Sequence, residues 1–331
     1  MEPYGSQKIS CRKRTLMQYA PEYINKIRNG FQGDSVEKVL RLQTLLSDFS
    51  KHPYLKDRIV LKGGTAITQF HFQFPRISVD IDLDYIGSPK LEGMKEERPR
   101  LEETMDQIFK SQKYVFEWSE DEHAGRKCML KFVNFHGNND NVRVDINYLM
   151  RIPVMQIVRM KSFSFEEDFH LEFPVLQLEE LYAGKTKALL ERGLARDLYD
   201  LYRLLKDKLP IDTNMWRTIT ILFCSSLRDD FRKYTSKRLD IVSETDVWTA
   251  LHPILRSDER PTREEMMKII YPFIEELFSF KENEKQYLDS LMKGVYDPSL
   301  LFGKGALAEK LAKHPALLWK AKNVSEYLTK Q

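Results

Sequence analysis

Residues 78–85, with the sequence SVDIDLDY, alternate strictly between apolar and polar side chains. Successive side chains of a strand point to opposite faces, so one face of this segment is apolar and the other carries Asp80, Asp82 and Asp84. Like charges at this spacing repel one another unless solvent screens them or a cation lies between them. The segment is therefore either an exposed edge strand or one side of a cation site.

A second segment, residues 141–148 (NVRVDINY), repeats the arrangement and places Asp145 on its polar face. Two strands with apolar backs and acidic fronts can lie side by side, which would bring Asp80, Asp82 and Asp145 together. Carboxylate oxygens are the ligands that Mg²⁺ prefers, and a pair of such ions stabilises the attacking and leaving oxygens of phosphoryl transfer. The three acids are thus predicted metal ligands, in a site expected to hold two Mg²⁺ ions.

Periodicity divides the chain into two unlike parts. Helical patterns cover residues 35–50 and 94–112, whereas β-rich runs separated by Gly and Asn turns cover 58–64, 113–119, 126–135 and 141–150. Beyond residue 175 the β signals cease, and helical patterns run from Leu178 to the end. We expect an α+β protein with an N-terminal extension (1–34), an α/β domain with a mixed sheet and helices (35–175) and an all-helical C-terminal domain (176–331).

A glycine turn precedes the acidic strand. Gly63 and Gly64 follow a short apolar run and allow close approach of the backbone, and Thr65 opens a helical segment whose free N–H groups suit a phosphate. Lys62 adds a positive charge next to the turn. A lone glycine turn is far more often a plain strand-to-helix connection, so its weight comes from its position shortly before Asp80 and Asp82.

Two charges lie on apolar helix faces in the second half. At helical spacing, Lys185 falls within the apolar stripe of residues 178–192, and Asp197 falls within that of residues 194–205, with Asp200 at its margin. A charge on a buried face requires a partner. An internal Lys185–Asp197 or Arg–Asp pair that ties the helices together would satisfy this requirement, and so would a bound anion next to Lys185.

The charge balance and the cysteines limit partners and location. The chain has 52 Lys and Arg against 49 Asp and Glu, a net charge of +3 that indicates no polyanionic partner, although 181–240 has 13 basic and 8 acidic residues. That excess suits either a solvated helical face or a surface for nucleic acid. No window is apolar enough for a membrane span, the first residues lack a signal peptide, and the three separated cysteines suggest neither disulfides nor zinc. We therefore expect a cytoplasmic protein without membrane partners.

Taken together, these segments resemble one known family. The strings LKGGTAITQF (61–70), FPRISVDIDLDYIG (74–87), VRVDINYL (142–149), LEELYAGKTKALLERGLARDLYDLYRLL (178–205) and HPALLWKAKNV (314–324) are similar to AbiEii-like nucleotidyltransferases. These are toxins of abortive-infection, type IV toxin-antitoxin systems, related to the MenT toxins within the DNA polymerase β-like superfamily. The combination of GGT, RxSxDxD and RDxYDL carries the resemblance, which runs from about residue 61 to 324.

The resemblance implies a role for each matching residue. Asp80 and Asp82 would be Mg²⁺ ligands, Asp145 would be the third acid, which activates the attacking hydroxyl, and Lys185 and Asp197 would complete the catalytic group. The nucleotide would be bound by the matching residues Lys62, Gly63, Gly64, Thr65, Ser78 and Lys185. Asp84 has no counterpart and is expected to be structural or solvated.

The implied activity is Mg²⁺-dependent transfer of NMP from an NTP to an acceptor hydroxyl, with release of pyrophosphate. The expected acceptor is RNA, in particular the 3′ end of tRNA, and a cognate antitoxin is an expected partner. Two alternatives stay open: a small-molecule or protein hydroxyl as acceptor, and a nucleotide-binding module without turnover.

Overall fold

A seven-stranded mixed sheet forms the centre of the first half of the chain. The computed structural model describes residues 19–120 and 122–330, so most of the predicted extension at 1–34 lies outside the described residues. The strand order is β3-β4-β5-β2-β1-β7-β6, with β2–β5 and β1–β7 parallel and the remaining pairs antiparallel. The strands are β1 (Ile59–Lys62), β2 (Asp80–Tyr85), β3 (Val115–Trp118), β4 (Gly125–Val133), β5 (Asn139–Asn147), β6 (Val158–Lys161) and β7 (Glu172–Val175).

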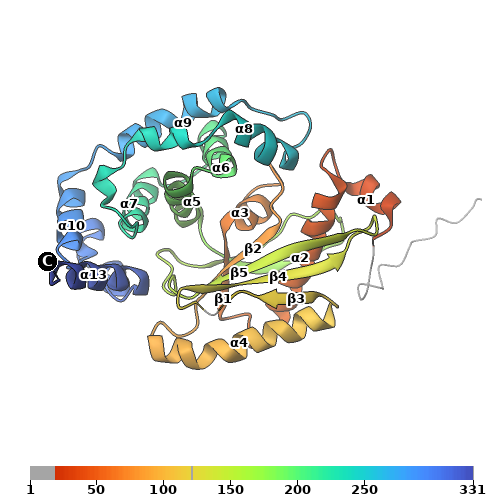
Figure 1. The fold of residues 1–331 in the computed structure, drawn as a ribbon, viewed down its shortest axis with the longest axis horizontal. Helices are drawn as coiled ribbons and strands as arrows, with labels where there is room; N and C mark the ends of the chain where they lie inside the picture. Colours follow the sequence, from red (N-terminus) through yellow and green to blue (C-terminus); the bar gives the residue numbers. More distant parts are fainter. Residues whose placement is uncertain (1–18, 121, 331) are drawn as a thin grey trace, which may run out of the picture.

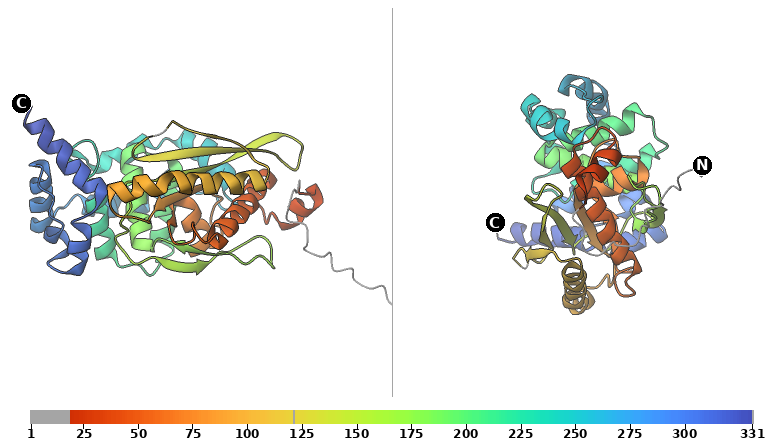
Figure 2. Two further views of the ribbon diagram at one scale, coloured as in Figure 1. Left: turned by 90° about the horizontal axis from the view of Figure 1, so that it is seen from below. Right: turned by 90° about the vertical axis from the view of Figure 1, so that its right-hand side faces the viewer.

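Helices cover both faces of this sheet. Figure 1 shows α4 along one face, while α3 and α5 lie on the other, and Figure 2 shows the same layering from two further sides. The helices of this half are α1 (Pro21–Ile27), α2 (Gly33–Lys51), α3 (Gly63–Ala66), which continues as the π-helix η1 (Ile67–His71), and α4 (Leu91–Ser111). The alternation of β2 and β5 places Ile81, Leu83, Val144 and Ile146 in the core, each at most 2% exposed.

The second half is helical, as predicted, and no strand occurs in its described residues 176–330. Its α-helices are α5 (Leu178–Arg192), α6 (Ala195–Lys206), α7 (Thr213–Cys224), α8 (Glu244–Asp246), α9 (Arg263–Leu277), α10 (Glu282–Met292), α11 (Ser299–Phe302), α12 (Ala306–Leu311) and α13 (Pro315–Leu328). Short 3₁₀ and π turns connect α7 to α9: η2 (Phe231–Lys233), η3 (Ser236–Ile241), η4 (Val247–Leu251) and η5 (His252–Ile254). Gly193 ends α5 in the left-handed conformation, with φ of 62°, which a residue with a side chain rarely adopts.

The expected α+β class is confirmed, with one strand that the sequence did not predict. β6 is short, and its residues are half-buried or exposed, so the segment has no apolar run to mark it. The predicted boundary at residue 175 coincides with the end of β7, but one apolar cluster includes residues of both halves. Division into separate domains therefore stays a prediction. No helix of the described residues is long and apolar enough to cross a membrane.

One buried histidine at the start of α13 makes the fold sensitive to acid. His314 is 1% exposed, and neither ring nitrogen has a hydrogen-bond partner among the described residues. Burial, together with Arg151 and Lys310, lowers the pKa of His314 to about 4, whereas an unfolded histidine titrates near 6.5. As the pH falls, the unfolded chain therefore binds a proton at His314 before the folded chain does. The contribution of His314 to the unfolding free energy is fully present above about pH 6.5 and declines as the pH falls toward 4.

We expect His314→Gln to remove this part of the acid dependence. Between pH 7.5 and 5.5 the wild type should lose ~1 kcal/mol more unfolding free energy than the variant, measured by urea titration. His170→Asn, at an exposed position, is the matched control and should follow the wild type. Equal pH dependence in the wild type and His314→Gln would contradict the assignment.

Candidate functional site

The two acidic strands lie side by side, as the sequence predicted. β2 and β5 run parallel, and their register places Asp82 opposite Asp145 and Asp80 opposite Arg143. Residues opposite one another in a sheet point to the same face, so the three acids share the face turned away from the strands' apolar core. Each of these acids is half-buried, which leaves its carboxylate partly accessible to solvent.

Arginine side chains lie against these acids. Arg143 Nη2 is 3.2 Å from Asp80 Oδ2, and Arg143 Nε is 3.0 Å from Asp145 Oδ1. Arg196, the second residue of α6, brings Nη1 to 3.9 Å from the same Asp80 oxygen. Sequence reasoning placed Arg143 on the acidic face without a role and missed Arg196, whose one signal was its position directly before Asp197.

The three carboxylates concentrate negative charge on this face of the sheet, even with the arginines beside them. Burial, together with the nearby carboxylates of Asp82 and Asp80, raises the pKa of Asp145 to about 6, although Arg143 and Lys127 act in the opposite direction. Within residues 19–120 and 122–330, no group of three or more His, Cys, Asp or Glu side chains is arranged to hold a metal ion. The acids share a face of the sheet, and Arg143 lies against two of them.

The glycine turn fits closely around the acidic strand. Gly63 has φ of +71°, and a Cβ atom there would lie 2.2 Å from Asp82 Oδ2. A Cβ on Gly64 would lie 2.7 Å from Ser78 Oγ and 2.8 Å from Arg76 Nη2. The absence of both side chains is what lets the turn approach Asp82 and the start of β2 this closely.

Thr65 fixes this turn to the strand. Its side chain is fully buried, and its hydroxyl donates to the carbonyl oxygen of Asp80 at 2.5 Å and shares a hydrogen bond of 3.1 Å with the hydroxyl of Ser78. The structure thus brings Thr65 and Ser78 to the acids, as predicted, but their hydroxyls are engaged with each other and with the backbone. What they offer a nucleotide is the position of the turn.

We expect Gly63→Ala to disturb the site through both effects at once. The positive φ disfavours alanine, and the methyl group overlaps the Asp82 carboxylate, so the unfolding free energy should fall by about 1–2 kcal/mol. Gly184→Ala is the matched control, because that position in α5 has open space around it and alanine favours a helix. Thermal and urea unfolding of both variants test this; a Gly63→Ala protein as stable as the wild type would refute it.

Lys62 and Asp84 form a pair of their own. The ammonium of Lys62 is hydrogen-bonded to Asp84 Oδ1, and Asp84 is 3% exposed. Burial raises the pKa of Asp84, and Lys62 only partly offsets this. Asp84 is therefore structural, one of the two roles expected for it, while the predicted phosphate contact of Lys62 would compete with this ion pair.

Lys185 lies between two carboxylates of α6. Its Nζ is 2.9 Å from Asp197 Oδ1 and 2.9 Å from Asp200 Oδ2, and its side chain is 8% exposed. Arg192 binds the second oxygen of Asp197 at 2.9 Å. Burial alone would raise the pKa of Asp197, but Lys185 and Arg192 outweigh it and hold that pKa below its usual value. The internal Lys185–Asp197 pair considered from the sequence is thus present.

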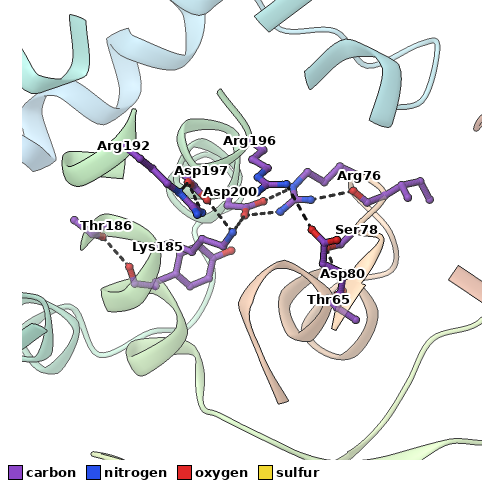
Figure 3. Close-up of polar contacts among 12 residues, drawn as sticks. Thr65, Arg76, Ser78, Asp80, Lys185, Thr186, Arg192, Arg196, Asp197 and Asp200 are labelled. Carbon is purple, nitrogen blue, oxygen red and sulfur yellow. Dashed lines mark hydrogen bonds and ion pairs between the residues drawn. The ribbon is translucent and has the colours of Figure 1, made fainter. Parts of the chain in front are cut away.

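Arg76 joins this cluster to the glycine turn. It is 2% exposed and donates two hydrogen bonds of 2.7 Å to the two carboxylate oxygens of Asp200. Figure 3 shows Arg76 and Arg196 between the Lys185–Asp197–Asp200 group on one side and Thr65, Ser78 and Asp80 on the other. Sequence reasoning missed the Arg76–Asp200 pair; its signal was an arginine two residues before Ser78 and an aspartate at the edge of an apolar stripe.

A mixed sheet with paired acids on neighbouring strands, a bare glycine turn beside them and a helical half that supplies a buried lysine defines the class of nucleotidyltransferases. The family model described as nucleotidyl transferase AbiEii toxin, type IV toxin-antitoxin system, matches residues 44–294. The chain belongs to this family, and it is a nucleotidyltransferase toxin of the type IV class.

A solved structure supports the fold assignment. The chain is similar to MenT4, a nucleotidyltransferase toxin from Mycobacterium tuberculosis H37Rv, with a TM-score of 0.57 and 17% sequence identity. The match covers 95% of this chain and 99% of MenT4. A search of curated proteins found no match. At this identity the likeness establishes the fold, including the helical second half.

Proposed function

We propose that the chain transfers NMP from an NTP to an acceptor hydroxyl at the face formed by β2 and β5, in a Mg²⁺-dependent reaction. The observation that carries this proposal is the register of the two strands, which sets Asp82 opposite Asp145, with Asp80 two residues away and the Gly63 turn packed closely against Asp82. The carboxylate oxygens of three acids that share one face of the sheet are donors that a hard divalent cation prefers. Asp80, Asp82 and Asp145 would hold it; when bound, it would neutralise charge on the phosphates.

The residues of this chain divide the remaining work. Asp145, the acid opposite Asp82 on the neighbouring strand, is the candidate to activate the attacking hydroxyl. The turn formed by Gly63, Gly64 and Thr65 packs against Asp82 and Ser78 and is the candidate to bind the nucleotide's phosphates. Positioning and charge neutralisation are the main catalytic contributions expected of a protein in phosphoryl transfer.

Lys185 is compatible with this proposal despite its ion pairs. An ammonium group has three N–H donors, and Asp197 and Asp200 take two of them. The third is available to a phosphate oxygen, while the two carboxylates fix the direction of the side chain. In this proposal Asp197 is a positioning residue for Lys185.

For the acceptor we propose RNA, with the 3′ end of tRNA as the preferred hydroxyl. Residues 181–240 carry 13 basic against 8 acidic residues, and this segment includes α5 and α6, which supply Lys185, Arg192 and Arg196 to the site. Basic side chains beside the acids would bind an RNA backbone electrostatically. A cognate antitoxin, as expected for a type IV toxin, would then act on this activity.

A labelling experiment tests the proposal. The purified chain is incubated with each α-³²P-labelled NTP in turn, together with Mg²⁺ and total cellular RNA, and the products are resolved on a denaturing gel. Label in a tRNA-sized band is the expected result, and its loss in EDTA would confirm the cation. Label on protein or on a small molecule would keep the chemistry and overturn RNA as acceptor. NTP binding without transfer or pyrophosphate release would overturn the enzymatic proposal in favour of a nucleotide-binding module.

A further inference from the structure

Arg143 occupies a particular position among the acids of the site. It extends from β5 directly opposite Asp80, and its guanidinium contacts Asp80 at 3.2 Å and Asp145 at 3.0 Å. One arginine therefore contacts two of the three proposed metal ligands. Its side chain is 35% exposed, so it has room to move toward solvent.

The contact with Asp145 is held by charge more than by a well-formed hydrogen bond. Arg143 Nε and Asp145 Oδ1 lie 3.0 Å apart, yet both atoms are buried and lack an aligned hydrogen-bond partner. Buried Arg76 differs, since it makes two aligned hydrogen bonds of 2.7 Å to Asp200. A planar guanidinium binds a carboxylate best in that bidentate form, whereas Arg143 donates one hydrogen bond of 3.2 Å to Asp80 and none to Asp145.

Charge explains why Arg143 is nonetheless held there. Three carboxylates share this face, and the cations closest to them are Arg143 and, at 3.9 Å from Asp80, Arg196. Without a metal ion, a guanidinium between Asp80 and Asp145 reduces the repulsion among the carboxylates. A divalent cation bound to the same oxygens would repel that guanidinium, so the two positive groups exclude each other.

We propose that Arg143 is the internal counter-ion of the metal-free site, which must leave Asp80 and Asp145 before a divalent cation binds. Arg143 is in this respect a positioning residue: it keeps the acids together without metal and lowers their affinity for the free ion. The inference rests on the metal site of the proposed function. It concerns cation binding alone, which can be measured without nucleotide, acceptor or turnover.

The test is the affinity for Mn²⁺ alone, followed by calorimetry and by the electron paramagnetic resonance signal of free Mn²⁺. We expect Arg143→Gln to bind Mn²⁺ about tenfold more tightly than the wild type, because the competing charge is gone. Arg143→Lys, which keeps the charge, should bind close to the wild-type affinity. Arg159→Gln, which removes an exposed ion pair between Arg159 on β6 and Glu172 on β7, is the matched control and should not change the affinity.

Two results would contradict the proposed role of Arg143 as a counter-ion. Equal or weaker Mn²⁺ binding by Arg143→Gln overturns it, as does an Arg143→Lys protein that binds as tightly as Arg143→Gln. Circular dichroism and thermal unfolding establish that the variants are folded; if Arg143→Gln does not fold, Arg143→Met takes its place with the same expected gain. The proposed function fails separately, by absence of NMP transfer in the wild type with Mg²⁺ and NTP.

Discussion

Asp80→Asn should reduce the rate of NMP transfer by about 10³-fold while the protein keeps its fold. Asparagine preserves the size of the side chain but removes the charge that a divalent cation requires, and it removes the counter-charge of Arg143 and Arg196. Asp80 is 22% exposed and its ion pairs are with partly exposed arginines, so the unfolding free energy should change by less than about 1 kcal/mol. Initial rates with the preferred α-labelled NTP measure the first effect, and urea unfolding measures the second.

Asp140→Asn is the matched control for this experiment. Asp140 lies on β5, is 18% exposed and forms an ion pair with Lys38, away from the other acids. It should transfer NMP at the wild-type rate. An Asp80→Asn protein with more than about a tenth of wild-type activity would remove Asp80 from the proposed metal ligands.

The sequence predicted the centre of this site because strand alternation is a strong local signal. Two segments with apolar backs and acidic fronts can share a core in few ways, and the structure places them side by side. Register decides that Asp82, and not Asp80, is opposite Asp145. Nothing in the two strings sets that register, since it depends on how β1 and β4 pair on either side.

The helical periodicity of the sequence predicted that Lys185 is buried, but it did not predict all of the residues that surround it. It placed Lys185 and Asp197 on buried faces, and the pair is present. The second carboxylate, Asp200, sits at the edge of its stripe, and its other partner, Arg76, is 124 positions earlier in the chain. A contact at that separation is made by the packing of α6 against the loop before β2, which no local pattern encodes.

The strand β6 was not predicted because its sequence carries only a weak local signal. Its four residues alternate between half-buried and exposed positions, so burial contributes little to it, and pairing with β7 stabilises it. The partner of Lys62 also could not be predicted from the neighbouring residues in the sequence. Its position beside the glycine turn suggested a phosphate ligand, whereas the fold gives it a buried partner, Asp84, on the neighbouring strand.

Asp200→Ala should cause the largest loss of stability, because it leaves a buried arginine without its partner. Asp200 is 1% exposed and binds Arg76 through both oxygens and Lys185 through one. Breaking a buried pair from one side typically costs about 3–5 kcal/mol. Burial would raise the pKa of Asp200, but Arg76 and Lys185 hold it below its usual value, so this stability is present above about pH 4 and is lost at lower pH.

Urea unfolding at pH 7 measures the effect, and two further variants identify its cause. Asp207→Ala removes a partly exposed partner of Arg203 at the end of α6 and should cost at most about 1 kcal/mol. Adding Arg76→Met to Asp200→Ala removes the stranded charge as well, so the double variant should lose clearly less than the sum of the two single changes. If instead Asp200→Ala stays within about 1 kcal/mol of the wild type, Arg76 must find other partners, and the Arg76–Asp200 pair would not be what holds α6 against the glycine turn.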